Sequence, residues 1–339
     1  MSGAPSAVNG QLEAPPVAKD QRSVFAKIAS RMPRAGWGLL IFVVLFIVGG
    51  LLRPSLFTLP GLISTATFAA ILAAASFGQT VAVIQGGIDL SVPSTIAFAA
   101  LGFLTWNASF GPVIAFVLAL GAGVVIGLAN GIIVAKIGLT PIVTTIAMNG
   151  LLFGLLLLNF PLSELTVVPD FVKSFTSDRL EIFGVSVAAV LPTVLILMVV
   201  LQAVLSYTGW GRSLFLVGSR EKAARLAGQP VARIRITGYA LSGLLAAFTG
   251  IVIVGYFSQA ETTMGNSYLL GSVAAVIVGG ASMFGGRGSM TGTFVGALVL
   301  GQVATLVAVF NLGADIQNLV YGVIILAVLA AYGRDRYAA

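Results

Sequence analysis

The sequence predicts an all-α integral membrane protein of about ten transmembrane helices, with one short helix in an inner loop. Hydrophobic residues make up 58% of the 339 residues and charged residues only 9%, whereas about a quarter of an average soluble domain is charged. The apolar residues fall in runs of roughly 16 to 25, long enough to cross a bilayer as helices. A soluble fold of this composition would expose far too much apolar surface.

Residues 1–35 are expected to form a cytoplasmic tail. Its start is rich in Ala, Pro, Gly and Ser, which is typical of disorder, and the first apolar run begins too late for a signal peptide. Further along, apolar residues share one helical face with basic residues beside them. This indicates either a short helix on the membrane surface or a plain basic flank before the first span. The residues concerned are Phe25, Ile28, Ala29 and Met32 with Lys27, Arg31 and Arg34.

Residues 36–339 are expected to form one transmembrane domain of ten spans. Their connections are polar or rich in glycine, and the eighth span is short and followed by a glycine-rich break. The expected spans are 36–52, 60–84, 92–109, 112–134, 141–160, 187–207, 237–257, 268–282, 290–310 and 317–332.

The basic residues test this count, because cytoplasmic loops of membrane proteins carry an excess of Lys and Arg. With the N-terminus inside and alternating sides, 15 of the 18 basic residues lie on the cytoplasmic side. Both termini are therefore expected in the cytoplasm, and the net charge of +7 points to the membrane rather than to nucleic acid. The longest outer loop, about 161–186, is interpreted as a docking surface, a short re-entrant element or a solvated loop of mixed charge.

The longest inner loop contains a predicted helix of about two turns within SREKAARLAGQP, residues 219–230. Ser219 is a good N-cap, and Glu221 suits the positive end of the helix dipole. Alanine and leucine are strong helix formers. Gly228 stops the helix and Pro230 prevents it from restarting.

Two interpretations fit the loop that contains this helix. The loop is either a positively charged segment that keeps its side of the protein in the cytoplasm, or its helix is a lever that fits a groove on a cytoplasmic partner. Connections between helices usually need only a few residues, and this one has some thirty, which favours the lever. The candidate contact residues are Arg220, Glu221, Lys222, Ala223, Ala224, Arg225, Leu226 and Gly228.

Three ordered motifs are spread from residue 85 to 301. They are QGGIDLSVPS, then GRSLFLVGSREKAARLAGQPVARIRITGYALSGLLAAFTGIV, then AAVIVGGASMFGGRGSMTGTFVGALVLG. Together they resemble the permease subunits of ribose/xylose-type bacterial ABC importers. The resemblance implies a membrane permease in a bacterial inner membrane, a cytoplasmic ATPase that drives it, and an extracytoplasmic solute-binding protein.

The same resemblance implies a membrane dimer. The sequence departs from the family pattern in two places: Pro93 replaces a glycine, and the run from Tyr268 to Gly271 keeps the tyrosine but lacks two acids. A second copy of this chain or a paralogous permease therefore both remain open as the dimer partner.

The turn motif of Gly86, Gly87, Asp89 and Ser91 is expected at the cytoplasmic end of the second span. Asp89 or Ser91 would cap the start of the third span, and the glycines would allow the tight turn before it. The alternative is an intramembrane charge that marks an ion path. The stretch AVIQGG at 82–87 recurs as AVIVGG at 275–280, which indicates an internal repeat or a chance match.

A glycine-rich inner loop follows the eighth span and contains Gly285, Gly286, Arg287 and Gly288. It has no G-x-x-x-x-G-K-[ST] run and no preceding strand, so it is not a nucleotide-binding loop. We expect close helix packing and a cytoplasmic arginine here, with ATP hydrolysed by a partner subunit. The chain itself is not expected to be an enzyme.

The predicted function is to pass a neutral sugar or sugar-like solute, without a cofactor or a metal site. The chain has no His and no Cys, and no carboxylate pair within the spans, which excludes most membrane enzymes. An ion-coupled secondary transporter is the main alternative, although such proteins usually need intramembrane charges. The candidate residues of the path are Gln79, Asn130, Thr144, Asn149 and Gln302. The commoner role of such residues is to form hydrogen bonds between helices.

Overall fold

The computed structural model describes residues 34–160 and 168–337. Most of these residues are helical. The predicted cytoplasmic tail, except for its last two residues, and its surface helix lie outside the described residues.

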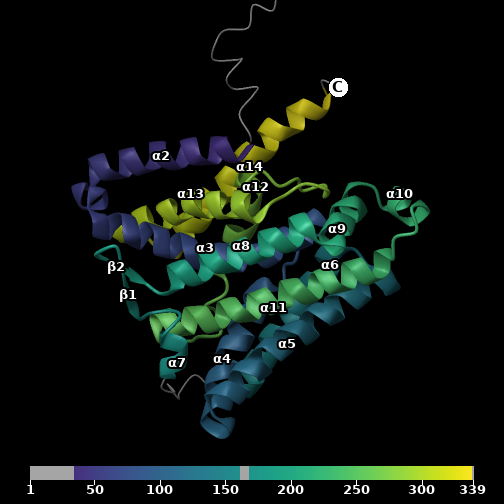
Figure 1. The fold of residues 1–339 in the computed structure, drawn as a ribbon, viewed down its shortest axis with the longest axis horizontal. Helices are drawn as coiled ribbons and strands as arrows, with labels where there is room; N and C mark the ends of the chain where they lie inside the picture. The colour runs from purple at the N-terminus through teal and green to yellow at the C-terminus, as the bar shows by residue number, and fades with distance from the viewer. Residues whose placement is uncertain (1–33, 161–167, 338–339) are drawn as a thin grey trace, which may run out of the picture. The chain divides into compact units, whose positions relative to one another are not determined.

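The chain order of the elements is simple (Figure 1). First come α2 (Arg34–Leu52), the 3-10 turn η1 (Pro54–Phe57), α3 (Leu59–Ile84), α4 (Val92–Phe110), α5 (Pro112–Ile132), the π turn η2 (Ile133–Ile137) and α6 (Pro141–Asn159). They are followed by α7 (Asp170–Lys173), the antiparallel strands β1 (Arg179–Ile182) and β2 (Val185–Ala188), and α8 (Val190–Tyr207). The last are α9 (Gly209–Ser219), α10 (Glu221–Leu226), α11 (Val231–Phe257), α12 (Ser267–Val278), α13 (Met290–Val309) and α14 (Ala314–Tyr337).

A helix occupies each of the ten predicted ranges, with shifted ends. α11 begins at Val231, before the expected start at 237, and α12 ends at Val278, before the expected end at 282. Within the described residues, six helices are long and apolar enough to cross a membrane: α3, α5 with η2, α6, α8, α11 and α13. The protein is therefore a multi-pass, predominantly helical membrane protein.

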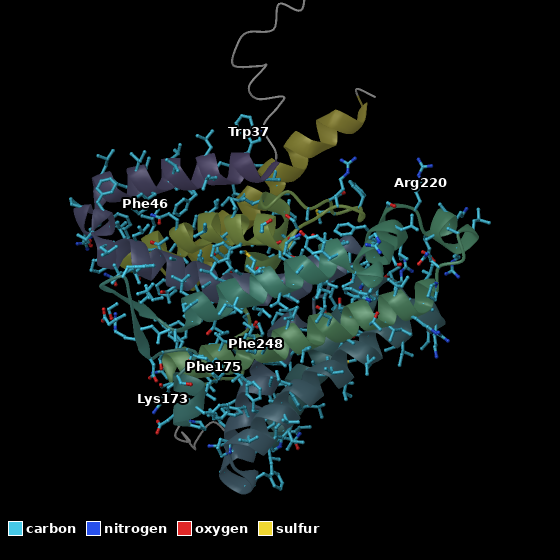
Figure 2. All side chains as sticks on the ribbon, in the orientation of Figure 1. Trp37, Phe46, Lys173, Phe175, Arg220 and Phe248 are labelled. Carbon is cyan, nitrogen blue, oxygen red and sulfur yellow. The ribbon has the colours of Figure 1, made fainter. Side chains whose placement is uncertain are left out.

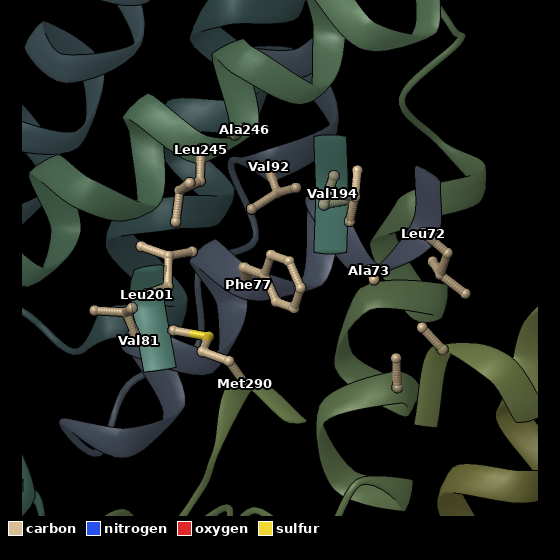
Figure 3. Packing of buried hydrophobic residues seen from close by; sticks show 14 of the residues in the cluster. Leu72, Ala73, Phe77, Val81, Val92, Val194, Leu201, Leu245, Ala246 and Met290 are labelled. Carbon is tan, nitrogen blue, oxygen red and sulfur yellow. The ribbon is translucent and has the colours of Figure 1, made fainter. Parts of the chain in front are cut away.

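Helix α3 lies at the centre of the packing. Within its most apolar stretch 94% of the residues are buried, against 22% for α6 and α8. The ring of Phe77 on α3 lies among Val92 of α4, Leu245 of α11 and Met290 of α13 (Figure 3). Five of the seven residues from 69 to 75 are alanines, which lets neighbouring backbones come close to α3. The poorly buried helices expose apolar faces, as expected for helices in contact with lipid.

Helices α5 and α11 pack closely through a glycine stripe. Gly123, Gly127 and Gly131 recur at every fourth residue of α5, and so share one face. A Cβ atom at any of the three would overlap with the backbone of α11, for example with the Gly243 carbonyl oxygen opposite Gly123. Small residues at this spacing are a typical contact between membrane helices.

The helices that contain the two copies of the AVI-x-GG stretch end in the same kind of cap. The glycine with the positive φ angle, however, is the first glycine of one copy and the second glycine of the other. Gly86 after α3 and Gly280 after α12 both adopt positive φ angles, 85° and 92°, where glycine is favoured. The sequence match would instead pair Gly86 with Gly279, whose φ is −66°. The resemblance between the two ends is therefore one of cap geometry and not of residue-by-residue equivalence.

The connections fall at two opposite ends of the helices. At one end the Gly286 N–H donates to the Ile84 carbonyl oxygen at 2.8 Å, which joins the α12–α13 loop to the end of α3. At the other end Gly255 of α11 lies against Thr176, next to α7 and the β1–β2 hairpin. Arg220 and Lys173, one from each group of connections, lie on opposite sides of the view in Figure 2. The structure thus separates the loops that the sequence assigns to opposite sides of the membrane.

Candidate coupling site and buried polar cluster

The long inner loop folds into two helices, α9 and α10, where one was predicted. The Thr208 hydroxyl accepts from the Gly211 N–H at 3.1 Å and so caps the start of α9. Ser219, predicted to cap the second helix, is instead the last residue of α9. Arg220 takes the N-cap position of α10 without a side-chain bond to it. The predicted helix is thus present but shorter, because α9 extends through Ser219.

The end of α10 matches the predicted glycine stop. Gly228 has a φ of 73°, in the left-handed region that favours glycine. The Gly228 N–H donates to the Arg225 carbonyl oxygen and the Gln229 N–H to the Ala224 carbonyl oxygen, both at 3.0 Å. This bond pair closes the helix and turns the chain toward α11.

Glu221 ties α10 to α11. One carboxylate oxygen accepts from Arg225 Nη2 at 2.6 Å, and the other accepts from Arg235 Nη2 of α11 at 2.8 Å. The hydrogen bond from Arg225, opposed by partial burial and aided by the charge of Arg235, holds the pKa of Glu221 below its usual value. Both carboxylate oxygens of Glu221 are therefore paired within this chain, and the pair with Arg235 links α10 to α11.

The apolar residues of α10 face in different directions. Ala224 is fully buried and packs into the main core, whereas Leu226 is 91% exposed. Arg220, Lys222, Ala223 and Arg225 are also exposed. The surface that α10 offers is consequently the side chains of Leu226 and the small Ala223 among basic residues.

The end of α9, the end of α3 and the α12–α13 loop meet at a contact rich in glycine, which we call the glycine junction. It consists of Ile84, Gly86, Gly218, Ser219, Gly285 and Gly286. A Cβ atom on Gly218 would overlap with the Ile84 carbonyl oxygen, and one on Gly285 would lie 2.5 Å from the Gly218 carbonyl oxygen. Gly285 and Gly286 have φ angles of 86° and 71°. The glycine-rich loop thus lies between α3 and α9, with Arg287 exposed and Gly288 against the Ile84 side chain.

Asp89 is 2% exposed, in the turn between α3 and α4. Its Oδ1 accepts from the Ser91 N–H at 3.0 Å and from the Ser91 hydroxyl at 2.6 Å. Its Oδ2 accepts from the Ser242 hydroxyl of α11 at 2.8 Å. The carboxylate therefore orders the start of α4, as a cap would, and also links that turn to a helix 153 residues away.

Two predicted path residues belong to the same buried cluster. With its amide oriented to satisfy both partners, Gln79 donates to the Asp89 carbonyl oxygen at 2.9 Å and accepts from the Asp89 N–H at 3.3 Å. Asn130 donates to the Ser91 hydroxyl at 2.9 Å. Gly87 approaches the Tyr239 hydroxyl so closely that a Cβ there would overlap with it. The turn 85–91 is thus folded back into the bundle and hydrogen-bonded there.

Of the other three predicted path residues, Thr144 and Asn149 lie on α6 and Gln302 lies on α13. Asn149 binds Ser94, through its amide oxygen at 3.3 Å and its backbone carbonyl at 3.0 Å. Thr144 is buried, and its hydroxyl has no hydrogen-bond partner among the described residues. Gln302 accepts from Thr65 at 3.2 Å, in a different part of the bundle. In the described structure, four of the five thus take part in side-chain hydrogen bonds that join separate segments of the chain.

This architecture defines a class: a multi-pass helical membrane protein with a basic helical hairpin at one end and one buried, hydrogen-bonded carboxylate, Asp89, in the turn between α3 and α4. More specifically, the chain belongs to the family described as the permease component of the branched-chain amino acid transport system, which matches residues 61–329.

Several relatives share most of its length. The ribose import permease protein RbsC of Bacillus subtilis is 31% identical over 87% of this chain and 91% of its own. The fructose import permease protein FrcC of Rhizobium meliloti is 33% identical over 78% of this chain and 72% of its own. The autoinducer 2 import system permease protein LsrC of Yersinia pseudotuberculosis is 31% identical over 90% and 86%. No solved structure matches the chain significantly.

Proposed function

We propose that this chain is the permease subunit of an ABC importer for a neutral sugar or sugar-like solute. The observation that carries the proposal is the α9–α10 hairpin, which stands at one end of the helices and exposes Leu226 among basic residues. Such a surface suits a cytoplasmic partner with an apolar groove and acidic surroundings. Permease components of ABC importers are not themselves enzymes, and the ATPase activity belongs to a partner subunit.

The substrate class is inferred from the relatives and from the charge of the bundle. The relatives named above import ribose, fructose and autoinducer 2, whereas the family description names branched-chain amino acids. An amino acid zwitterion would need charged groups to replace its hydration. In the described helices and their inner turns, Asp89 is the buried carboxylate, and hydrogen bonds within the chain already engage both its oxygens. We therefore favour an uncharged, hydroxyl-rich solute.

The basic α9–α10 hairpin and both termini are assigned to the cytoplasm, in a ten-span arrangement. The supporting observations are the 15-to-3 distribution of basic residues and the separation of the connections to two ends. An extracytoplasmic solute-binding protein would deliver the solute at the end that carries α7 and the β1–β2 hairpin. A second permease, a copy of this chain or a paralogue, would complete the membrane dimer.

Reconstitution tests the function. In liposomes that contain this chain with the ATPase and binding protein of the same transport system, we expect ATP-dependent uptake of a radiolabelled neutral sugar, with leucine neither taken up nor competing. Liposomes with this chain alone should take up nothing under a proton or sodium gradient, because the carboxylate in the bundle is already hydrogen-bonded. Gradient-driven uptake by the chain alone would refute the assignment to an ABC importer, and ATP-driven leucine uptake would refute the substrate class.

A single cysteine tests the orientation and the partner surface together, because the chain has no native cysteine. A Leu226→Cys thiol should react with a membrane-impermeant maleimide only in inside-out vesicles, and bound ATPase should protect it. Phe183→Cys is the matched control, since Phe183 is also fully exposed but lies on the β1–β2 hairpin. It should react from the other side and remain unprotected. Labelling of Leu226→Cys from outside, or equal labelling with and without ATPase, would contradict the proposal.

A further inference from the structure

Two adjoining cavities lie where α11, α12, α13 and α14 come together, at the end of the bundle away from the glycine junction. Their volumes are about 300 and 450 Å³, and both are lined by Phe257, Ser267 and Tyr268. Binding sites for small molecules usually have volumes of about 300 to 1,000 Å³. None of the five predicted path residues lines either cavity.

The lining combines aromatic rings with a few uncharged polar groups. We call this surface the vestibule and define it by Phe68, Phe257, Ser267, Tyr268, Gln317 and Tyr321. None of these six side chains carries a charge at neutral pH. Glu261 lines only the second cavity, and it is exposed. A monosaccharide has the complementary chemistry: its C–H faces pack on aromatic rings, and its hydroxyls pair with amide and hydroxyl groups.

The polar groups of the vestibule are held in position by the fold. The Tyr321 hydroxyl donates to the Leu300 carbonyl oxygen at 3.1 Å and accepts from Gln317 Nε2 at 3.0 Å. These two bonds fix the Gln317 amide and leave its Oε1 without a hydrogen-bond partner among the described residues. An oriented acceptor in a largely apolar cavity is the arrangement that confers specificity for a hydroxyl group.

Gly271 of α12 makes room for this arrangement. A Cβ atom there would lie 3.0 Å from Leu72 Cδ1 and 3.2 Å from Tyr321 Cε2. A larger side chain would therefore push the Tyr321 ring away from α12, and Gln317 with it. The absence of a side chain at Gly271 is thus coupled to the position of Tyr321 and Gln317.

We propose that the vestibule receives a neutral monosaccharide on its way into the bundle, with Gln317 and Tyr268 as its recognition groups. This inference rests on the proposed function and names the site at which that function begins. Four of the five polar residues predicted from sequence instead form hydrogen bonds between segments of the chain.

Modification after assembly tests the proposal without depending on how a variant folds. In the liposomes described above, the thiol of Ser267→Cys should react with a membrane-impermeant methanethiosulfonate added outside. Uptake of the sugar should then fall at least tenfold, and the transported sugar should protect the thiol from the reagent. The probes are D-ribose, D-xylose, D-fructose and D-glucose. The ATPase activity stimulated by the binding protein should stay within twofold of that of the unlabelled variant, because Ser267 does not lie on the α9–α10 hairpin. Ser174→Cys, exposed on the same end but outside both cavities, is the control.

Substitution supplies the second readout. Gln317→Leu should raise the KM for the sugar by about 3- to 10-fold, the effect of one neutral hydrogen bond, while Asn318→Leu on the same helix leaves it unchanged. Continued uptake by fully labelled Ser267→Cys would overturn the vestibule and leave the permease assignment intact. An unchanged KM in Gln317→Leu would remove Gln317 from the proposal. If the wild-type complex imports none of the four sugars, the monosaccharide vestibule is refuted, and ATP-driven uptake of another uncharged sugar-like solute would leave the proposed function standing.

Discussion

Gly218→Ala is expected to disrupt the protein more than any other single methyl group added to the inner face. The new Cβ would overlap with the Ile84 carbonyl oxygen and lie 2.8 Å from the Gly286 nitrogen. Both are backbone atoms, joined to each other by a hydrogen bond of 2.8 Å, so neither can rotate away. Overpacking typically costs about 1 to 3 kcal/mol, and a clash with two backbones belongs at the upper end of that range.

The measurement for Gly218→Ala is thermal unfolding in detergent, beside co-purification of the ATPase. We expect the apparent Tm to fall by several degrees, since 1 kcal/mol corresponds to roughly 2 to 4 °C in domains of about 150 to 250 residues. We also expect the ATPase to be lost, because α9 can no longer pack against Ile84 and Gly286. Gly209→Ala is the matched control: it lies on the same helix, and a Cβ there meets nothing within 4 Å. Equal stability of the two variants would show that α9 is not held by the glycine junction.

Asp89→Ala is expected to have the second large effect. It removes the acceptor for the Ser91 N–H and for two hydroxyls, all within a turn that is almost fully buried. A buried donor left without a partner costs about 1 to 3 kcal/mol, and the missing carboxylate leaves a cavity in addition. We therefore expect low yield and a reduced Tm in detergent.

Asp89→Asn separates the two interpretations of this residue. The asparagine oxygen can still accept from Ser91, and its amide can donate to the Ser242 hydroxyl, which accepts as well as it donates. If Asp89 serves the fold, the variant should be nearly as stable as the native protein and should retain most of its uptake. A stable Asp89→Asn protein without uptake would instead mean that the negative charge takes part in transport.

The sequence predicted the helices well because their signals are local. Each of the ten apolar ranges contains a helix, and six of the helices are long and apolar enough to cross a membrane. Gly228 and Pro230 located the end of α10, since glycine stops and proline breaks act on neighbouring residues. The cap at Ser219 was placed wrongly for a related reason. Its local pattern suits an N-cap, but α9 had not been predicted as a separate helix, and Ser219 is its final residue.

The site was harder to predict because its contacts are distant in sequence. The bond between Asp89 and Ser242 spans 153 residues, and that between Thr65 and Gln302 spans 237. Nothing local in the chain indicates that Gln302 and Asn130 lie in different parts of the bundle. The vestibule was missed similarly: Tyr268 drew attention only as part of a motif, and Gln317 and Tyr321 carry no motif at all.

Helix α3 connects the two surfaces to which function has been assigned. Phe68 and Leu72 line one of the cavities, and Ile84, on the same unbroken helix, accepts the hydrogen bond of the glycine junction. Sixteen residues of helix separate Phe68 from Ile84, a length of about 24 Å. If the proposed ATPase moves α9, that movement would act on a stiff helix whose far end forms part of the cavity wall. The position of the α9–α10 hairpin and the shape of the cavity wall are therefore linked through α3.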